Sequence, residues 1–192
     1  GYWRHPQGGW ISLTAKEPWT IDNDAMVNTL ANIKDRLAVQ RVYNKPYTIS
    51  EYNHPYPNQY GAEGQPMLCI YGRLQGWDGV FQYSYNHYVN DFELQANPWC
   101  FFDCIARTDV LAHFPACAAM FIRGDVSEAK EALVAAVDMK NYQETMIKNK
   151  SVNFDFKAMG LDNRLSLIHH TSLDFSGGGK SPAEIQSLPA DQ

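Results

Sequence analysis

The amino-acid sequence predicts an α/β fold. Three observations support this prediction: helical and β-type segments alternate over the first two thirds of the chain, the helical segments carry apolar residues at helical spacing, and clusters of Gly, Pro and Asn separate them. Such alternation is typical of parallel strands joined by helices. With 192 residues, the chain is long enough to form a domain with a substantial core.

The first predicted helix follows an irregular segment, residues 1–19, and runs to about residue 42. Asp22-Asn23-Asp24 supplies a helix N-cap. One apolar face then repeats at i, i+4, i+7 and i+11, formed by Met26, Leu30, Ile33 and Leu37. Asn44-Lys45-Pro46 ends this helix.

The following elements are expected in this order: a β-type run over 47–52, a loop over 54–58, a helix over 61–75, a second β-type run over 80–85, a polar loop over 86–97 and a helix over 101–122. Pro115 should interrupt or kink the last helix. Residues 128–150 fit either one helix or a strand followed by a helix, and 152–175 fit short strands and turns. The Gly-rich start of residues 176–192 predicts a linker or loose tail.

The charge balance excludes some partners. The net charge is −5 and no Lys/Arg-rich run is present, so neither nucleic acid nor an anionic membrane surface is expected to bind. No apolar stretch approaches the roughly 18 residues that a bilayer span requires. No signal peptide opens the sequence, so the compartment is not predicted.

The four cysteines are Cys69, Cys100, Cys104 and Cys117. The i, i+4 spacing of Cys100 and Cys104 is compatible with a metal site or a bridge. No second close pair and no nearby His completes a zinc site, so buried free thiols are expected.

Glu51 is the leading candidate for chemistry. It ends a β-type run and precedes a loop rich in Asn, His, Tyr and Pro. In a (β/α)8 barrel the active site lies at the C-terminal ends of the strands, where a rigid strand can hold a carboxylate. The alternative is a strand-end Glu that forms a salt bridge to a helix.

Three motifs resemble the (β/α)8-barrel clan of retaining glycoside hydrolases that contains β-galactosidases, cellulases and mannanases. Thr48-Ile49-Ser50-Glu51-Tyr52-Asn53 is similar to the nucleophile strand of this clan. The segment from Gly76 to Tyr85 is similar to the closing strand, and Tyr2-Trp3-Arg4-His5-Pro6 to the end of the sixth strand of bacterial members. The resemblance covers roughly the first 125 residues.

This resemblance implies a C-terminal part of a barrel, about strands 6–8 with their helices, over residues 1–125. A small β-rich or mixed extension would follow over 126–175, and a loose tail over 176–192. A whole barrel takes about 250 residues, and an open sheet edge needs a partner. We therefore expect a portion of a longer protein, completed by the N-terminal barrel half or by a self-associated copy.

The resemblance also implies a double-displacement mechanism in which Glu51 attacks the anomeric carbon. A second carboxylic acid is then needed at about 5 Å to protonate the leaving oxygen. In the clan this acid follows an Asn, and the sequence contains no Asn-Glu pair. The chain is therefore expected to carry the nucleophile and to lack the acid/base.

Other residues are candidates for contacts with a carbohydrate substrate. Asn53 and His54 follow the nucleophile, although His54 before Pro55 is equally compatible with simple loop closure. Tyr2 and His5 are expected beside Glu51, where a Tyr hydroxyl would favour the ionised carboxylate. Tyr85 is the expected stacking platform, whereas the clan has Trp there, and His87 and Asp91 would line a pocket rim. Trp77 is also a candidate, with packing against a helix as the alternative.

No cofactor and no metal are expected. Two other functions stay open at this point. One is a non-catalytic carbohydrate-binding or scaffold domain that keeps the barrel face without the acid. The other is a different barrel hydrolase, for example a metal-assisted one. Neither the sugar nor the linkage follows from the sequence.

Overall fold

The structure, a computed structural model, describes residues 1–8, 18–87, 100–150 and 154–185. It is a mixed α/β fold with small parallel sheets. The chain divides into two compact units that interleave along the sequence. Unit 1 comprises Gly1–Thr29, Thr48–Ile70 and Gly79–Asp125, and unit 2 comprises Leu30–Tyr47, Tyr71–Asp78 and Val126–Gln192. A segment of unit 1 ends at Asp125 and a segment of unit 2 begins at Val126. Residues 30–47 and 71–78 group with the C-terminal part.

Unit 1 contains a β-α-β arrangement, whose helix extends by its last four residues, 71–74, into a segment of unit 2. Strand β1 (Thr48–Tyr52) is followed by helix α1 (Gly61–Leu74) and strand β2 (Gly79–Gln82). The two strands pair in parallel, with Thr48 opposite Gly79 and Ile49 opposite Val80. A register irregularity lies between Ile49 and Tyr52. These three elements are the ones that the periodicity predicted, with ends that differ by no more than three residues.

The N-terminal segment adds a further parallel pairing next to β1. Tyr2 and Asn53 form an isolated parallel bridge, and the Trp3 amide donates to the Asn53 carbonyl at 3.0 Å. Trp3 is buried, and its indole N–H donates to the Asp24 carbonyl at 2.9 Å. Arg4 pairs with the Asp24 carboxylate, with Nε 2.6 Å from Oδ1. Three segments therefore run side by side in the order 2–3, β1, β2.

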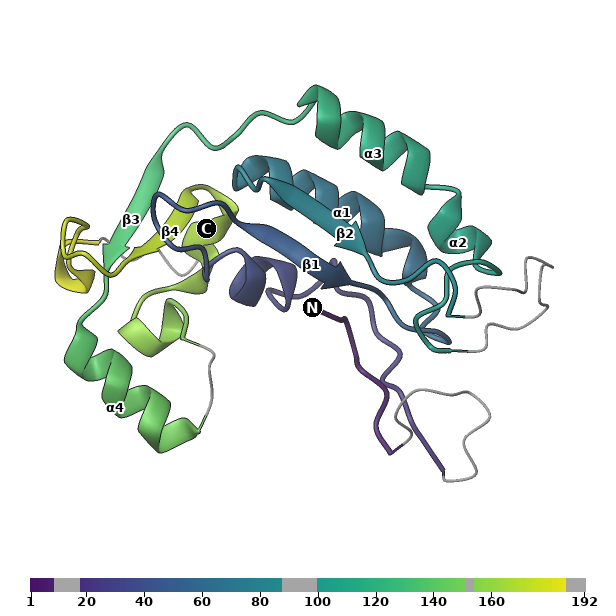
Figure 1. Cartoon of the computed structure of the whole chain (residues 1–192), viewed down its shortest axis with the longest axis horizontal. Coiled ribbons are helices and arrows are strands. Elements are labelled where there is room, and N and C mark those ends of the chain that lie inside the picture. Colours follow the sequence, from purple (N-terminus) through teal and green to yellow (C-terminus); the bar gives the residue numbers. More distant parts are fainter. Residues whose placement is uncertain (9–17, 88–99, 151–153, 186–192) are drawn as a thin grey trace. The chain divides into compact units, whose positions relative to one another are not determined.

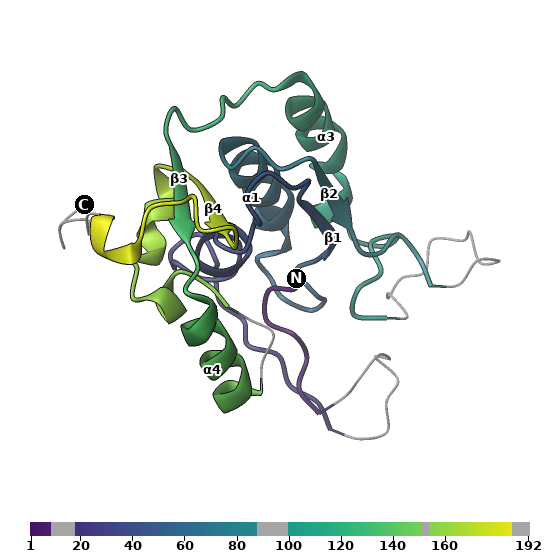
Figure 2. The same ribbon diagram turned by 60° about the vertical axis from the view of Figure 1, so that its left-hand side comes forward.

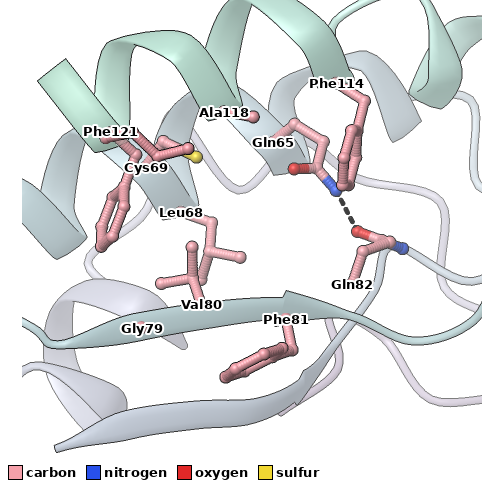
Figure 3. Close-up of a pocket in the computed structure, with 11 residues that line it drawn as sticks. Gln65, Leu68, Cys69, Gly79, Val80, Phe81, Gln82, Phe114, Ala118 and Phe121 are labelled. Carbon is pink, nitrogen blue, oxygen red and sulfur yellow. Dashed lines mark hydrogen bonds between the residues drawn. The ribbon is translucent and has the colours of Figure 1, made fainter.

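Helix α1 covers one face of the β1–β2 pair (Figure 1). Ile49 is buried, and Val80 points towards Leu68 of α1 (Figure 3). The opposite face is bare, because Thr48 and Ser50 are exposed and the Phe81 side chain is 56% exposed. Alternation along a strand explains this division, since residues i and i+2 share a face.

The predicted helix over 101–122 is only partly correct. Residues 101–107 form turns, α2 spans Thr108–Leu111, and α3 spans Phe114–Arg123. Pro115 lies in the first turn of α3, where its missing N–H costs nothing. Gly124, at φ 74°, ends α3 in the left-handed conformation that favours glycine.

Unit 2 contains a second parallel pair, β3 (Ala132–Ala136) with β4 (His170–Asp174), in unbroken register from Ala132↔His170 to Ala136↔Asp174. Parallel bridges extend the sheet on both sides, at Val42↔Leu173 and Ala135↔Lys180. Helix α4 (Met139–Asn149) follows β3 (Figure 2), so the strand-then-helix alternative for 128–150 is correct. Asp138 caps α4 by accepting the amides of Lys140 and Asn141.

The core of unit 2 draws on residues far apart in the sequence. Its buried members include Val39, Leu133, Phe156 and Leu173. The long helix expected up to residue 42 is wrong: a π-helix, Ile33–Leu37, is the regular element there, and Asn32 precedes it at φ 60°. Short 3-10 helices, Lys157–Met159, Asn163–Leu167 and Pro182–Glu184, complete the described part of the chain.

Candidate active site

Glu51 lies at the C-terminal end of β1 with an exposed side chain. Its Oε2 accepts a hydrogen bond from the hydroxyl of Tyr2, which comes from the neighbouring parallel segment. The structure therefore brings these two predicted site residues together. Burial, and then the hydrogen bond to Glu51, raise the pKa of Tyr2 above its ordinary value. Tyr2 thus stays a proton donor to this carboxylate over the physiological pH range.

An aromatic cluster holds Tyr2 in place. Its ring packs on Phe102 at a centroid distance of 4.5 Å, with Tyr83 at 6.2 Å and His5 at 5.7 Å. His5 therefore lies next to Tyr2 and also packs on Phe102. Neither Tyr83 nor Phe102 was predicted as a site residue.

The buried Asn53 side chain connects three segments through hydrogen bonds. Its side-chain nitrogen donates to the carbonyls of Tyr83 at 2.5 Å and Phe102 at 2.7 Å. The Ser84 amide in turn donates to the Phe102 carbonyl at 3.0 Å. These bonds fix the loop after β2 against the end of β1. The Asn53 side chain is fully buried, so it lies in the interior of unit 1 and not on its surface.

His54 is buried between Tyr52 and Glu63. Its Nε2 lies 3.2 Å from Glu63 Oε1, and its Nδ1 lies 3.3 Å from the Tyr52 hydroxyl. Burial lowers the pKa of His54 to about 4, and the Glu63 hydrogen bond only partly opposes this shift. The neutral ring then donates from Nε2 to Glu63 and accepts from Tyr52. This placement favours loop closure over a contact with a sugar.

Because His54 is held neutral, we expect the stability of the fold to depend on pH. The pKa of His54 in the folded chain, about 4, lies below the ordinary value of 6.5. The unfolded chain therefore binds the extra proton first as the pH falls. The stabilisation is present above pH 6.5 and is lost as the pH falls towards 4, at up to about 1.4 kcal/mol per pH unit. Urea unfolding at several pH values measures this slope.

The control for this effect is the exposed His113. His113→Gln should keep the slope, whereas His54→Gln should flatten it. Proton NMR of the native chain gives a second readout that does not depend on a folded variant. A His54 ring that titrates near 6.5 in the native state would contradict the prediction.

Trp77 and Tyr85 differ in placement. Trp77, in unit 2, is buried with its ring edge-on to Tyr47 at 5.7 Å, which favours a packing role. Tyr85 is 62% exposed and lines a cavity of 510 Å³ with Phe81, Phe114 and Leu111. A second cavity of 180 Å³ lies between β2, α1 and α3 (Figure 3). Glu51 lines neither cavity. Asp91 lies outside the described residues.

A second polar cluster follows β2. His87 Nδ1 lies 2.5 Å from Asp103 Oδ1, and the Tyr83 hydroxyl lies 3.1 Å from His87 Nε2. Asp103 is fully buried and also accepts the amides of His87 at 3.1 Å and Cys100 at 3.0 Å. Of these residues the sequence singled out His87, as a rim residue, and Cys100, as one of two cysteines compatible with a metal site or a bridge. No local sequence pattern predicts the role of Asp103, because it contacts His87 only where the chain folds back.

Three side chains at this place carry atoms of the kinds that bind metal ions. Donor atoms of His87, Cys100 and Asp103 lie within 4.8 Å of one another.

All four cysteines are buried and form no disulfide. Burial raises the pKa of Cys69 to about 12 and that of Cys104 to about 11, which keeps both thiols protonated and unreactive.

Comparison with protein-family models, curated proteins and solved structures found no match to the chain. Within the described residues, no helix combines the length and apolar character required to span a bilayer. The site is therefore defined by its own geometry: an exposed strand-end carboxylate, a tyrosine hydroxyl donated to it, and a second tyrosine held by a His–Asp pair.

Proposed function

We propose that this chain is the nucleophile-bearing portion of a retaining glycoside hydrolase with Glu51 as the nucleophile. The observation that carries the proposal is the hydrogen bond from Tyr2 to Glu51 at the carboxyl ends of adjacent parallel segments. A nucleophilic carboxylate must be ionised, rigidly placed and open to a ligand. The Tyr2 donor, the strand and the exposure of Glu51 meet these three needs.

In the proposed reaction a Glu51 oxygen forms a bond to the anomeric carbon while the bond from that carbon to the leaving-group oxygen breaks. A carboxylic acid from outside this chain protonates the leaving oxygen, and water later releases the sugar. Tyr2 holds the Glu51 carboxylate in its ionised form and fixes its rotamer.

Covalent labelling with a fluorinated sugar tests this function and does not require the acid/base residue. In a 2-deoxy-2-fluoroglycosyl fluoride, Glu51 would attack the anomeric carbon and fluoride would leave with the bonding electrons. Fluoride needs little protonation to depart, and the second fluorine slows hydrolysis of the product. Glucosyl, galactosyl and mannosyl fluorides are incubated with the full chain, and the labelled peptide is mapped by mass spectrometry. Labelling at Glu51 supports the proposal, whereas labelling elsewhere or none would overturn it.

We also propose that further barrel strands, supplied by polypeptide outside this sequence, cover the bare face of β1 and β2. Parallel sheets are almost always covered on both faces, yet Thr48, Ser50 and Phe81 are exposed on one of them. Among the described strands β2 pairs with β1 alone, so its other edge offers unpaired backbone groups next to the apolar cavity of Figure 3.

Light scattering separates this partner from a second copy of the chain. The chain by itself is expected to be a monomer that binds a hydrophobic dye through the exposed Phe81 surface, and Phe81→Ser should weaken the dye signal. The control Ile147→Ser alters an apolar side chain that is 79% exposed on α4. A discrete dimer that Phe81→Ser dissociates would instead identify the second copy as the partner.

A further inference from the structure

The loop after β2 carries a hydrogen-bonded chain that the proposed mechanism does not use. It runs from the Tyr83 hydroxyl to His87 Nε2 (3.1 Å) and from His87 Nδ1 to Asp103 Oδ1 (2.5 Å). Asp103 is fully buried, and its carboxylate is held by two backbone amides. The far end of the chain therefore has little freedom to move.

A neutral His87 ring fixes the directions of these bonds. A carboxylate only accepts hydrogen bonds, so His87 Nδ1 carries the proton shared with Asp103. In the neutral ring Nε2 then has a lone pair and accepts the proton of the Tyr83 hydroxyl. The Tyr83 oxygen is left with lone pairs directed to the surroundings, so it presents an acceptor rather than a donor.

The position of Tyr83 links this chain to Glu51. The Tyr83 ring lies at 6.2 Å from the ring of Tyr2, whose hydroxyl binds Glu51. The Tyr83 amide donates to the Tyr52 carbonyl at 2.9 Å, directly after Glu51 in the sequence. Two tyrosines thus stand side by side, with Tyr2 donating to the carboxylate and Tyr83 presenting an acceptor.

Two other interpretations of this cluster, a Ser-His-Asp triad and a zinc site, fit the geometry less well. In a Ser-His-Asp triad the serine and the carboxylate bind different ring nitrogens, but Ser84 Oγ and Asp103 Oδ1 both approach His87 Nδ1, the serine at 3.1 Å. Two ligands of one tetrahedral zinc ion with bonds of ~2 Å lie roughly 3.3 Å apart. The separation of Nδ1 and Oδ1, 2.5 Å, is well below this spacing.

We propose that Tyr83 is a substrate-binding residue of the Glu51 site, accepting a hydrogen bond from a hydroxyl of the bound sugar, with His87 and Asp103 as its positioning residues. This inference rests on the proposed glycosidase function and adds a specific contact to it. Asp103 selects the His87 tautomer, and the tautomer sets which way the Tyr83 hydroxyl donates.

The test has one arm that requires no sugar. In ¹⁵N spectra of the full chain, His87 should be the neutral tautomer protonated at Nδ1, and Tyr83→Phe should shift the Nε2 resonance. Asp103→Asn should increase the Nε2-protonated form, because the amide can donate to Nδ1. A wild-type His87 protonated at Nε2 alone would overturn the relay. So would a 1:1 zinc complex that His87→Ala and Cys100→Ser both abolish.

The second arm measures the rate at which the fluoroglycosyl fluorides label Glu51. Tyr83→Phe should slow labelling about tenfold, the worth of one neutral hydrogen bond. The control Tyr60→Phe, on an exposed loop tyrosine, should leave the rate unchanged. Among deoxy analogues of the best label, one should react equally with wild type and Tyr83→Phe, and its missing hydroxyl identifies the contact.

The outcomes separate the two proposals. If wild type is labelled at Glu51 and Tyr83→Phe is labelled equally fast, the Tyr83 contact is wrong and the glycosidase proposal stands. If wild type is not labelled by any of the three fluorides, the glycosidase proposal and the sugar contact fail together. Circular dichroism of each variant confirms that a slower rate does not reflect unfolding.

Discussion

Replacing Glu51 by Gln is expected to reduce the rate of covalent labelling by roughly 10³-fold or more, since removal of a nucleophile eliminates the bond-forming atom. The amide keeps the size of the side chain and can still accept the Tyr2 hydrogen bond through its oxygen. Because the Glu51 side chain is exposed, the substitution should leave the free energy of unfolding nearly unchanged. Loss of labelling without loss of stability therefore identifies a chemical role.

The matched control is Glu144→Gln on α4, whose side chain is 68% exposed and takes part in a long i, i+4 ion pair. It removes the same charge and should not alter labelling. Tyr2→Phe provides a graded result, because it keeps the ring packed on Phe102 and removes only the donor. An unchanged rate in Glu51→Gln would refute the nucleophile assignment.

Replacing Gln75 by Leu is expected to destabilise unit 2 by roughly 3–5 kcal/mol, the cost of leaving several buried polar groups without partners. The Gln75 side chain is fully buried, and its nitrogen donates to the carbonyls of Ser166 and His169, both at 2.6 Å. Its oxygen accepts the amide and the hydroxyl of Thr171, both at 2.9 Å. Leu has a similar volume but satisfies none of these groups.

Amide hydrogen exchange and urea unfolding measure this loss. The Leu173 amide, in β4, donates to the Arg41 carbonyl at 2.7 Å and should lose protection in Gln75→Leu. Gln143→Leu, the same substitution at an exposed position of α4, should change the free energy of unfolding by no more than about 0.5 kcal/mol. Equal effects of the two substitutions would argue against a structural role for Gln75.

Local patterns predicted some elements of the fold and failed for others. The runs that became β1, α1 and β2 were recognisable because periodic apolar residues stand between turn-forming residues such as Pro46 and Gly76. The helix expected before residue 42 shares its apolar positions with the real structure, since Met26, Ile33 and Leu37 are all buried. Leu30, the fourth predicted apolar position, is only half-buried. Burial was therefore predicted for three of the four positions, and the backbone conformation was not predicted.

The site residues also divide into those that local sequence patterns predicted and those that they did not. Glu51 was identifiable because a strand end followed by a polar loop is a local feature. Phe102 and Asp103 were not, since they approach Tyr2 and His87 only after the chain returns across many residues. The turn at 101–107 replaces the expected helix where the Asp103 carboxylate accepts the Cys100 amide, an interaction that helical periodicity does not register.

The interleaving of the two units has a consequence for how the chain is made. The Gln75 oxygen meets the Thr171 amide across 96 residues of sequence, and Val42 pairs with Leu173 across a longer span. At ~5–20 residues per second, a ribosome needs roughly 5–20 s to supply the second partner. During that interval segment 30–47 and Gln75 lack the C-terminal residues that bury them, so their apolar and polar groups are exposed. Cleavage of the chain after Asp125 would remove these partner residues permanently.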